Sequence, residues 1–131
     1  MRHKTESLLA SITLALAGLH FVLETGYHYQ YGQPLPALIV DYIWIGLAVF
    51  GGIISLRVRP RSAAGLLAAS WGFGAGFAWR SAFGRLVQSE ADRAAGNGEP
   101  LIVTYVVLSA LVLAFCLLLW SLWLTYKPVR V

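Results

Sequence analysis

Charged residues are scarce in this sequence: Asp, Glu, Lys and Arg together account for only 12% of its 131 residues. That share is about half of what is usual in soluble domains. Hydrophobic residues make up 58%, and the mean hydropathy is +0.68. A soluble fold has no place for so much apolar surface, so the composition predicts an integral membrane protein. No polar linker divides the chain, and we expect a single domain over residues 1–131.

Cysteine and catalytic motifs are also nearly absent. The one cysteine, Cys116, lies in an apolar run without a partner thiol, and we interpret it as a small packed side chain. The sequence has no phosphate-binding loop, no nucleophile elbow and no specific metal-binding motif. It therefore argues against an enzyme with a soluble cofactor, predicts no metal centre and identifies no cofactor.

The formal net charge of +4 does not predict nucleic-acid binding. The basic residues stand beside apolar segments and not in a stripe with interleaved aromatic residues. They include Arg57, Arg59, Arg61, Lys127 and Arg130. This placement is typical of the cytoplasmic loops of membrane proteins, where the positive-inside rule operates.

Four apolar segments follow one another along the chain. Each is near the roughly 20 residues that cross about 30 Å of hydrocarbon as a helix. Because a helix satisfies its own backbone in lipid, the pattern predicts an all-α integral membrane protein, a four-helix transmembrane bundle. Breaks are expected at residues 32–34, 57–61 and 88–100. The segments cover residues 7–27, 37–56, 63–83 and 101–126, and no proline interrupts them.

Lys and Arg are unequally distributed among the connections. Arg2 and Lys4 precede the first segment and three arginines lie in residues 57–61, whereas residues 28–36 contain neither Lys nor Arg. We therefore predict a multi-pass protein of the cell inner (cytoplasmic) membrane with both termini in the cytoplasm. An aromatic belt at the end of the last segment agrees with this orientation, and it consists of Trp120, Trp123 and Tyr126.

A cleaved signal peptide over residues 1–17 is a competing interpretation. Basic residues there precede an apolar run that contains Ala15-Leu16-Ala17, a typical cleavage site. Cleavage would leave three helices. The apolar run continues to Leu23, as a spanning helix requires and a signal peptide does not. This continuation favours a membrane-spanning first helix.

Small residues mark one face of the third segment. Gly72 and Gly76 form a GxxxG pair that Ala68 extends backward. Such a face lets a second helix approach closely, and van der Waals contacts then drive association in lipid. We expect a helix contact here, either within the bundle or between two copies of the chain.

Ionisable residues within spanning helices are costly and are therefore candidates for function. At about 1.5 Å per residue, His20 lies about 18 Å and Glu24 about 24 Å from the inner boundary. Asp41 lies about 7 Å below the outer boundary, and Arg80 and Tyr105 reach the same outer level. We expect Arg80 to bridge Glu24 and Asp41 with its planar guanidinium group.

His20, Glu24 and His28 recur every four residues and therefore share one helix face. One interpretation is that these residues contribute to a polar pocket open to the outer leaflet. The other is that the charged residues only tie three helices together. His20 and His28 are about 12 Å apart along a helix, too far for one metal ion, although a pair such as His20 with Glu24 stays open. The candidate catalytic residues are His20 and Glu24, and the candidate ligand-binding residues are His28, Asp41, Trp44, Trp79, Arg80 and Tyr105.

The stretch Leu19 to Glu24, with its His-x-x-x-Glu spacing, resembles the first shared helix of the emopamil-binding, EXPERA-type family of four-helix sterol isomerases and sterol-binding proteins. The sequence Gly98-Glu99-Pro100 is a weaker similarity. The Asn and Trp that such isomerases carry on their last helix are not matched around residues 109–112. The resemblance implies a pocket that handles protons or a carbocation.

We expect a small inner-membrane protein that binds an amphiphilic ligand, such as a lipid, a quinone or a sterol-like molecule, or that docks as a subunit of a larger membrane complex. The alternative is a membrane enzyme, an isomerase or redox type, that acts on a lipid-soluble substrate with His20 and Glu24 as its proton-handling pair. A transporter or channel formed by a homo-oligomer is the third hypothesis. The bilayer is the expected partner in each case.

Overall fold

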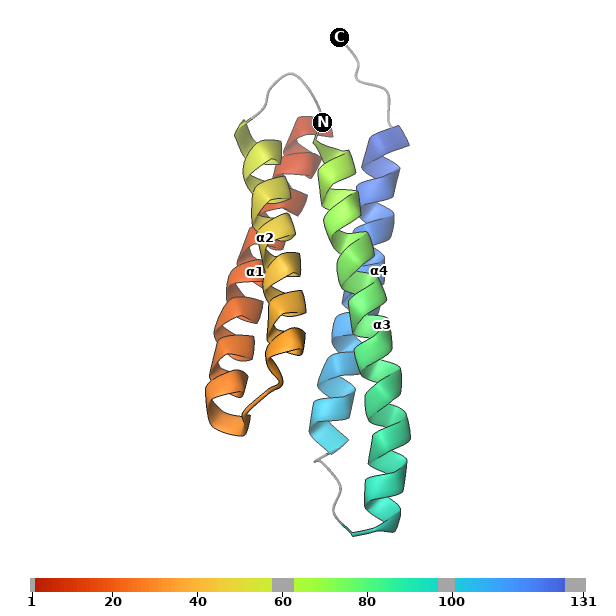
Figure 1. Ribbon diagram of the computed structural model, residues 1–131. Coiled ribbons are helices and arrows are strands. Elements are labelled where there is room, and N and C mark those ends of the chain that lie inside the picture. Colours follow the sequence, from red (N-terminus) through yellow and green to blue (C-terminus); the bar gives the residue numbers. More distant parts are fainter. Residues whose placement is uncertain (1, 58–62, 97–100, 127–131) are drawn as a thin grey trace.

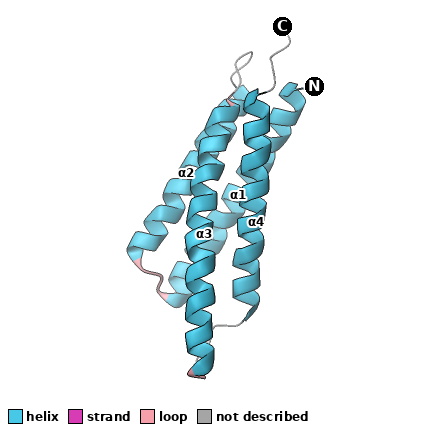
Figure 2. Cartoon of the chain, turned by 90° about the vertical axis from the view of Figure 1, so that its right-hand side faces the viewer, coloured by secondary structure: helices cyan, strands magenta, loops and turns pink. Residues whose placement is uncertain are grey.

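The computed structural model describes residues 2–57, 63–96 and 101–126, and all of them except short connections are helical. Consecutive helices run antiparallel, so the start of the first helix and the end of the last lie at the same end of the bundle (Figure 1, Figure 2). The four helices are α1 (Arg2–Tyr31), α2 (Leu35–Arg57), α3 (Ala64–Ala94) and α4 (Leu101–Tyr126).

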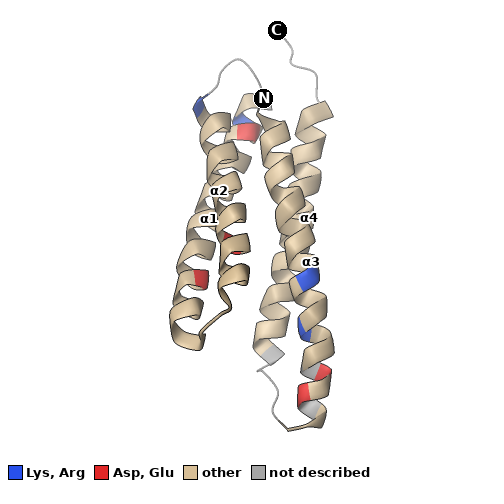
Figure 3. Cartoon of the chain, in the orientation of Figure 1, with Lys and Arg blue, Asp and Glu red and all other residues tan. Residues whose placement is uncertain are grey.

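Three of the helices are long and apolar enough to cross a membrane: α1 from His3, α2, and α4 from Ile102. The described residues of α3 do not meet the same criterion, because its apolar part is rich in glycine and is followed by Arg80 and Arg85. All charged residues of α3 lie in its second half (Figure 3). The prediction of a helical, membrane-associated protein is thus supported for three spans.

The helix bounds agree with the apolar segments at some ends and not at others. The fourth helix covers residues 101–126 as predicted, and α2 is close to its predicted range. By contrast, α1 is longer at both ends, and α3 continues past Phe83 to Ala94, into the predicted break at residues 88–100. Gln, Glu, Ala and Arg are good helix formers, so a polar stretch rich in them continues the helix after the apolar pattern has ended.

A short turn joins α1 to α2 and positions the residues discussed below. Gly32 has a φ of 67°, a left-handed conformation that favours glycine, and its N–H donates to the carbonyl oxygen of His28 at 2.9 Å. This is a common way for a helix to end. Gln33 and Pro34 complete the turn, which was predicted at residues 32–34.

The helices pack mainly as two hairpins, α1 with α2 and α3 with α4. Contacts between α2 and α3 join the two hairpins. The hairpins diverge toward the end that holds the α1–α2 turn (Figure 1). Two polar contacts tie α1 to α3 at the opposite half: Glu6 accepts the backbone N–H of Ala63 at 2.8 Å, and the indole of Trp71 donates to Thr13 Oγ1 at 3.0 Å. Glu6 thus stabilises the start of α3 with a buried carboxylate.

Glycines allow the closest contacts around α2. A Cβ atom on Gly51 would meet the backbone of Leu66 at 3.4 Å, and one on Gly52 would come within 2.7 Å of Leu14 Cγ. A Cβ atom on Gly74 of α3 would overlap the indole ring of Trp44 on α2. Each of these glycines therefore lets a side chain or backbone from another helix come close.

The contact predicted at Gly72 and Gly76 is not the one that joins the helices of this chain. Among the described residues, a Cβ atom on Gly76 would meet nothing within 4 Å, and one on Gly72 would meet only Leu118, at 3.8 Å. The close contact is at Gly74, two residues from each. Within the chain the GxxxG spacing identified the right stretch of α3 but not the residue of closest approach, because spacing alone does not say which face a neighbouring helix covers. A contact of this face with a second copy of the chain stays a prediction.

We predict that Gly74→Ala destabilises the protein by about 1–3 kcal/mol, because the new methyl group forces the packed Trp44 ring to move. Gly76→Ala is the matched control in the same helix, with the same gain in helix propensity and open space for the methyl group. Unfolding in mixed detergent micelles would measure both. Equal stability of the two variants would contradict this packing role of Gly74.

Candidate functional site

Polar side chains gather near the α1–α2 turn. His20 and Glu24 lie one helical turn apart on α1, Asp41 lies on α2, and Gln33 lies in the turn. We call these four residues the polar cluster. Asp41 has a side chain that is only 1% exposed, whereas the side chain of His20 is 30% exposed. The cluster therefore has a buried end at Asp41 and an accessible side at His20.

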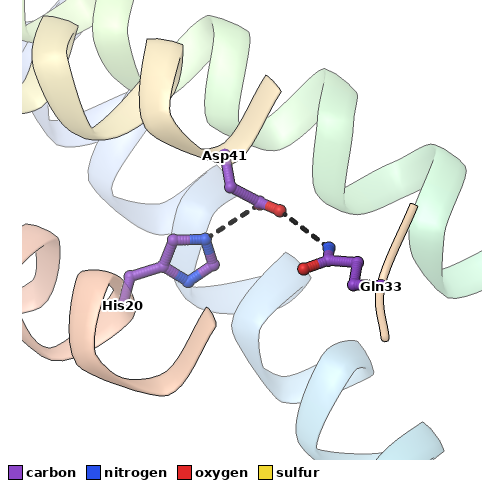
Figure 4. A network of polar contacts seen from close by, with 3 residues as sticks. All are labelled: His20, Gln33 and Asp41. Carbon is purple, nitrogen blue, oxygen red and sulfur yellow. Dashed lines mark hydrogen bonds and ion pairs between the residues drawn. The ribbon is translucent and has the colours of Figure 1, made fainter. Parts of the chain in front are cut away.

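Both carboxylate oxygens of Asp41 have a hydrogen-bond partner (Figure 4). His20 Nε2 lies 3.1 Å from Oδ1, and Gln33 Nε2 donates to Oδ2 at 3.2 Å. A buried carboxylate is costly unless its oxygens are bonded, so these two contacts make the position of Asp41 tenable. They also link α1, the turn and α2 through one side chain.

Glu24 brings a second carboxylate to the cluster. One ligand atom from each of His20, Glu24 and Asp41 lies within 4.8 Å of the other two. The amide of Gln33 also interacts with the carboxyl group of Glu24, and Arg85 acts on it electrostatically from α3. Two acidic groups, a histidine and an amide thus occupy one small region.

Trp44 forms an apolar wall beside the polar cluster. Its ring meets the ring of His20 edge to face, with centroids 5.0 Å apart, and meets the ring of Trp71 at 5.4 Å. The indole N–H of Trp44 is buried and has no hydrogen-bond partner among the residues that the structure describes. The contact with Trp44 restricts the orientation of the His20 ring.

His28 lies next to the polar cluster and supports it indirectly. Its Nδ1 atom is 3.0 Å from the backbone carbonyl oxygen of Gln33, which accepts a hydrogen bond from the ring N–H. His28 therefore holds the turn that presents Gln33 to Asp41. The structure thus brings five predicted site residues together or next to one another: His20, Glu24, His28, Asp41 and Trp44.

The other predicted site residues lie elsewhere. Trp79 is 52% exposed on α3 and packs against Phe83 and Phe115, and Tyr105 is 60% exposed on α4. Neither ring lines the polar cluster in the contacts described for the chain. Position along a helix does not decide where a side chain points, because that direction depends on the rotation of the helix about its axis.

The expected bridge from Arg80 to Glu24 and Asp41 is not formed among the described residues. Arg80 is exposed, and the oxygens of Asp41 bond to His20 and Gln33 instead. Arg85 has an electrostatic influence on Glu24, and this influence is weaker than those of burial, Asp41, His20 and Gln33. Five residues along a helix turn a side chain by about 140° relative to the first, so the two arginines face different sides of α3.

Gln33 and Glu6 were missed by reasoning from the sequence. Gln33 lies between Gly32 and Pro34, in a segment interpreted only as a break, and its role depends on the turn that folds it back toward Asp41. Glu6 lies before the predicted first span, and its contact with the start of α3 joins residues 57 positions apart. A carboxylate near the start of an apolar segment was the only available signal for Glu6.

We predict that Asp41→Leu destabilises the protein far more than Arg80→Leu. Replacing Asp41 removes the acceptor of the ring N–H of His20 and one of the two carboxylates with which the Gln33 amide interacts, and a lost acceptor costs about 1–3 kcal/mol per group. Arg80 is exposed, and its replacement should change the stability by about 0.5 kcal/mol or less. Unfolding in mixed micelles gives both values. A larger loss of stability for Arg80→Leu than for Asp41→Leu would support the arginine bridge that the sequence predicted.

Comparisons with protein-family models, with curated proteins and with solved structures found no match to this chain. The resemblance of residues 19–24 to the emopamil-binding family therefore has no support from the family models. The interpretation of the polar cluster consequently rests on its own chemistry.

Proposed function

We propose that this chain is a four-span protein of the bacterial-type inner membrane with both termini in the cytoplasm. Three candidate spans, the arginines at residues 57–61 and the aromatic residues at the end of α4 support this topology. The extensive packing of α3 against α4 supports a fourth span formed by residues 64–83 of α3. The remainder of α3 would then project beyond the outer boundary of the hydrocarbon core.

Single-cysteine labelling in a Cys116→Ala background tests this topology. We expect Gln30→Cys and Ala95→Cys to react with a membrane-impermeant thiol reagent from the outside, and His3→Cys to react only after the inner face is exposed. All three positions are exposed. Ala95 decides whether α3 spans the membrane, because outward labelling of residue 30 with inward labelling of residue 95 would mean that α3 does not cross.

The polar cluster serves, in this proposal, as the binding site for the polar group of an amphiphilic ligand, such as a lipid, a quinone or a sterol-like molecule. The observation that carries the proposal is the buried Asp41 carboxylate, whose hydrogen-bond partner His20 is partly exposed. A molecule dissolved in the bilayer would approach from the side of His20. Trp44 would pack against the apolar part of such a ligand.

The chemistry of the polar cluster selects the kind of polar group. Glu24, Asp41 and the unpartnered oxygen of Gln33 are all hydrogen-bond acceptors. They favour a hydroxyl or ammonium group, which can donate, and repel a phosphate or carboxylate. A ligand with a neutral or cationic donor group is therefore the best match.

The second candidate function is a membrane enzyme, an isomerase or redox type, that uses His20 and Glu24 for proton transfer. The contact that favours it is the hydrogen bond between His20 and Asp41, because a carboxylate that orients an imidazole is a common arrangement in acid–base catalysis. Glu24 lies close enough to act on the same substrate atom. Docking to a larger membrane complex would use other surfaces, such as that around the exposed Trp79.

Analysis of what co-purifies in mild detergent tests the ligand site. We expect mass spectrometry to find an amphiphile with wild-type protein, and a loss of at least about tenfold in its occupancy in His20→Ala and Glu24→Gln. Glu90→Gln, an exposed carboxylate on α3, is the matched control for Glu24→Gln and should retain the ligand. Full occupancy in both folded cluster variants would rule out this site.

A further inference from the structure

The polar cluster contains the donor set of a metal site. We infer that His20, Glu24 and Asp41 bind one divalent first-row metal ion, with Zn²⁺ as the best-matched example. One imidazole nitrogen and two carboxylate oxygens are ligands that Zn²⁺ accepts, and Mn²⁺ and Fe²⁺ accept the same set. The inference rests on the polar cluster being the working site of the proposed function, and it adds a metal ion to that site.

The separations between the donor atoms are suited to a single ion. Two ligands that are each about 2.1 Å from a metal ion lie about 3.0–3.4 Å apart when they are neighbours in its coordination shell. His20 Nε2 and Asp41 Oδ1 are already 3.1 Å apart. A ligand atom of Glu24 completes a group whose members all lie within 4.8 Å of one another, so a small rotation of that side chain closes the shell.

Groups behind the three ligands hold them in place. Gln33 donates to Oδ2 of Asp41, the carboxylate oxygen that does not face His20, and Trp44 packs against the His20 ring. Metal ligands are commonly oriented by such hydrogen bonds from a second layer of residues. A mobile carboxylate on a surface has no such support, and Asp41 is 1% exposed.

A buried polar atom without a partner also points to a missing ligand. Oε1 of Gln33 is buried and accepts no hydrogen bond from the described residues. Figure 4 shows it on the side of the amide that faces His20. An open coordination position of the metal ion, occupied by water or by a ligand hydroxyl group, would provide the donor that this oxygen lacks.

The charges of the polar cluster favour a divalent cation. Two carboxylates lie close together, and in an apolar environment their repulsion is strong. Without a metal ion, the positive groups near these carboxylates include Arg85, which interacts electrostatically with Glu24, and the ring N–H of His20, which faces Asp41. When a metal ion binds Nε2 of His20, the proton on that nitrogen moves to Nδ1 if the ring is neutral, or is released if the ring is charged. The metal ion then neutralises both carboxylates together.

The sequence predicted no metal centre, because a site that uses both His20 and His28 would span too great a distance along the helix. His28 cannot complete the set, since its ring bonds to the backbone of Gln33 and lies about 12 Å along the helix from His20. Asp41 comes from α2 instead. Packing of α1 against α2 supplies the third ligand.

Metal titration of protein purified without a histidine tag tests the site. After treatment with EDTA and exchange into metal-free detergent, we expect calorimetry to show one Zn²⁺ per chain. His20→Gln, Glu24→Gln and Asp41→Asn should each weaken binding by at least about tenfold. His3→Gln and Glu90→Gln make the same chemical changes at exposed positions outside the polar cluster and should bind as the wild type does.

A direct spectroscopic measurement on wild-type protein covers the case in which a cluster variant does not fold. The zinc X-ray absorption spectrum should show one imidazole and otherwise oxygen ligands at about 2.0–2.1 Å. The inference is overturned if no saturable binding occurs, if the spectrum shows no imidazole, or if folded cluster variants bind Zn²⁺ as tightly as the two controls.

The metal and ligand proposals fail in distinguishable ways. Metal binding is measured after the amphiphile has been removed, and amphiphile binding is measured in the presence of EDTA. An amphiphile that binds the polar cluster while Zn²⁺ does not would overturn the metal site alone. If Zn²⁺ binds but no amphiphile co-purifies with the wild-type protein, the metal site is supported and the proposed ligand is contradicted.

Discussion

The buried carboxylate of Asp41 is the group on which the arrangement around it depends. An acidic side chain inside an apolar bundle is tenable only if both oxygens are bonded, and here one contact comes from α1 and the other from the α1–α2 turn. Satisfying Asp41 therefore requires the turn to fold back and the two helices to keep a fixed register. The same requirement brings His20, Glu24 and Gln33 together. Stability and the candidate site consequently have a common physical origin.

The packing of the bundle reaches the polar cluster through Trp44. One side of its ring meets His20, and its N–H edge lies against Gly74 of α3, where a larger residue would overlap it. Trp71 adds a second aromatic contact and bonds to Thr13 on α1. The orientation of the His20 ring therefore depends on the junction between α2 and α3. A change at Gly74 would reach the site through Trp44.

The proposed ligand site and the proposed metal site use the same residues for compatible reasons. An acceptor-rich cluster attracts a donor group, and two neighbouring carboxylates with an imidazole attract a divalent cation. A metal ion with an open position could itself hold the hydroxyl group of an amphiphile. His20, whose side chain is partly exposed, is the member of the polar cluster that either partner would reach first. Both proposals thus follow from one buried charge with one accessible neighbour.

The sequence by itself determined the helical class, the approximate apolar segments, the turn at residues 32–34 and the common depth of Glu24 and Asp41, because composition and the rise per residue act along one helix at a time. The same depth argument predicted His20, Glu24 and Asp41 as site residues. Only the tertiary structure decided which faces meet: Asp41 bonds to His20 and Gln33 and not to Arg80, and Gly74 and not Gly76 makes the close contact. The rotation of a helix about its axis is set by packing against its neighbours, and a nearly uniform apolar sequence such as that of α2 or α4 carries little information about it.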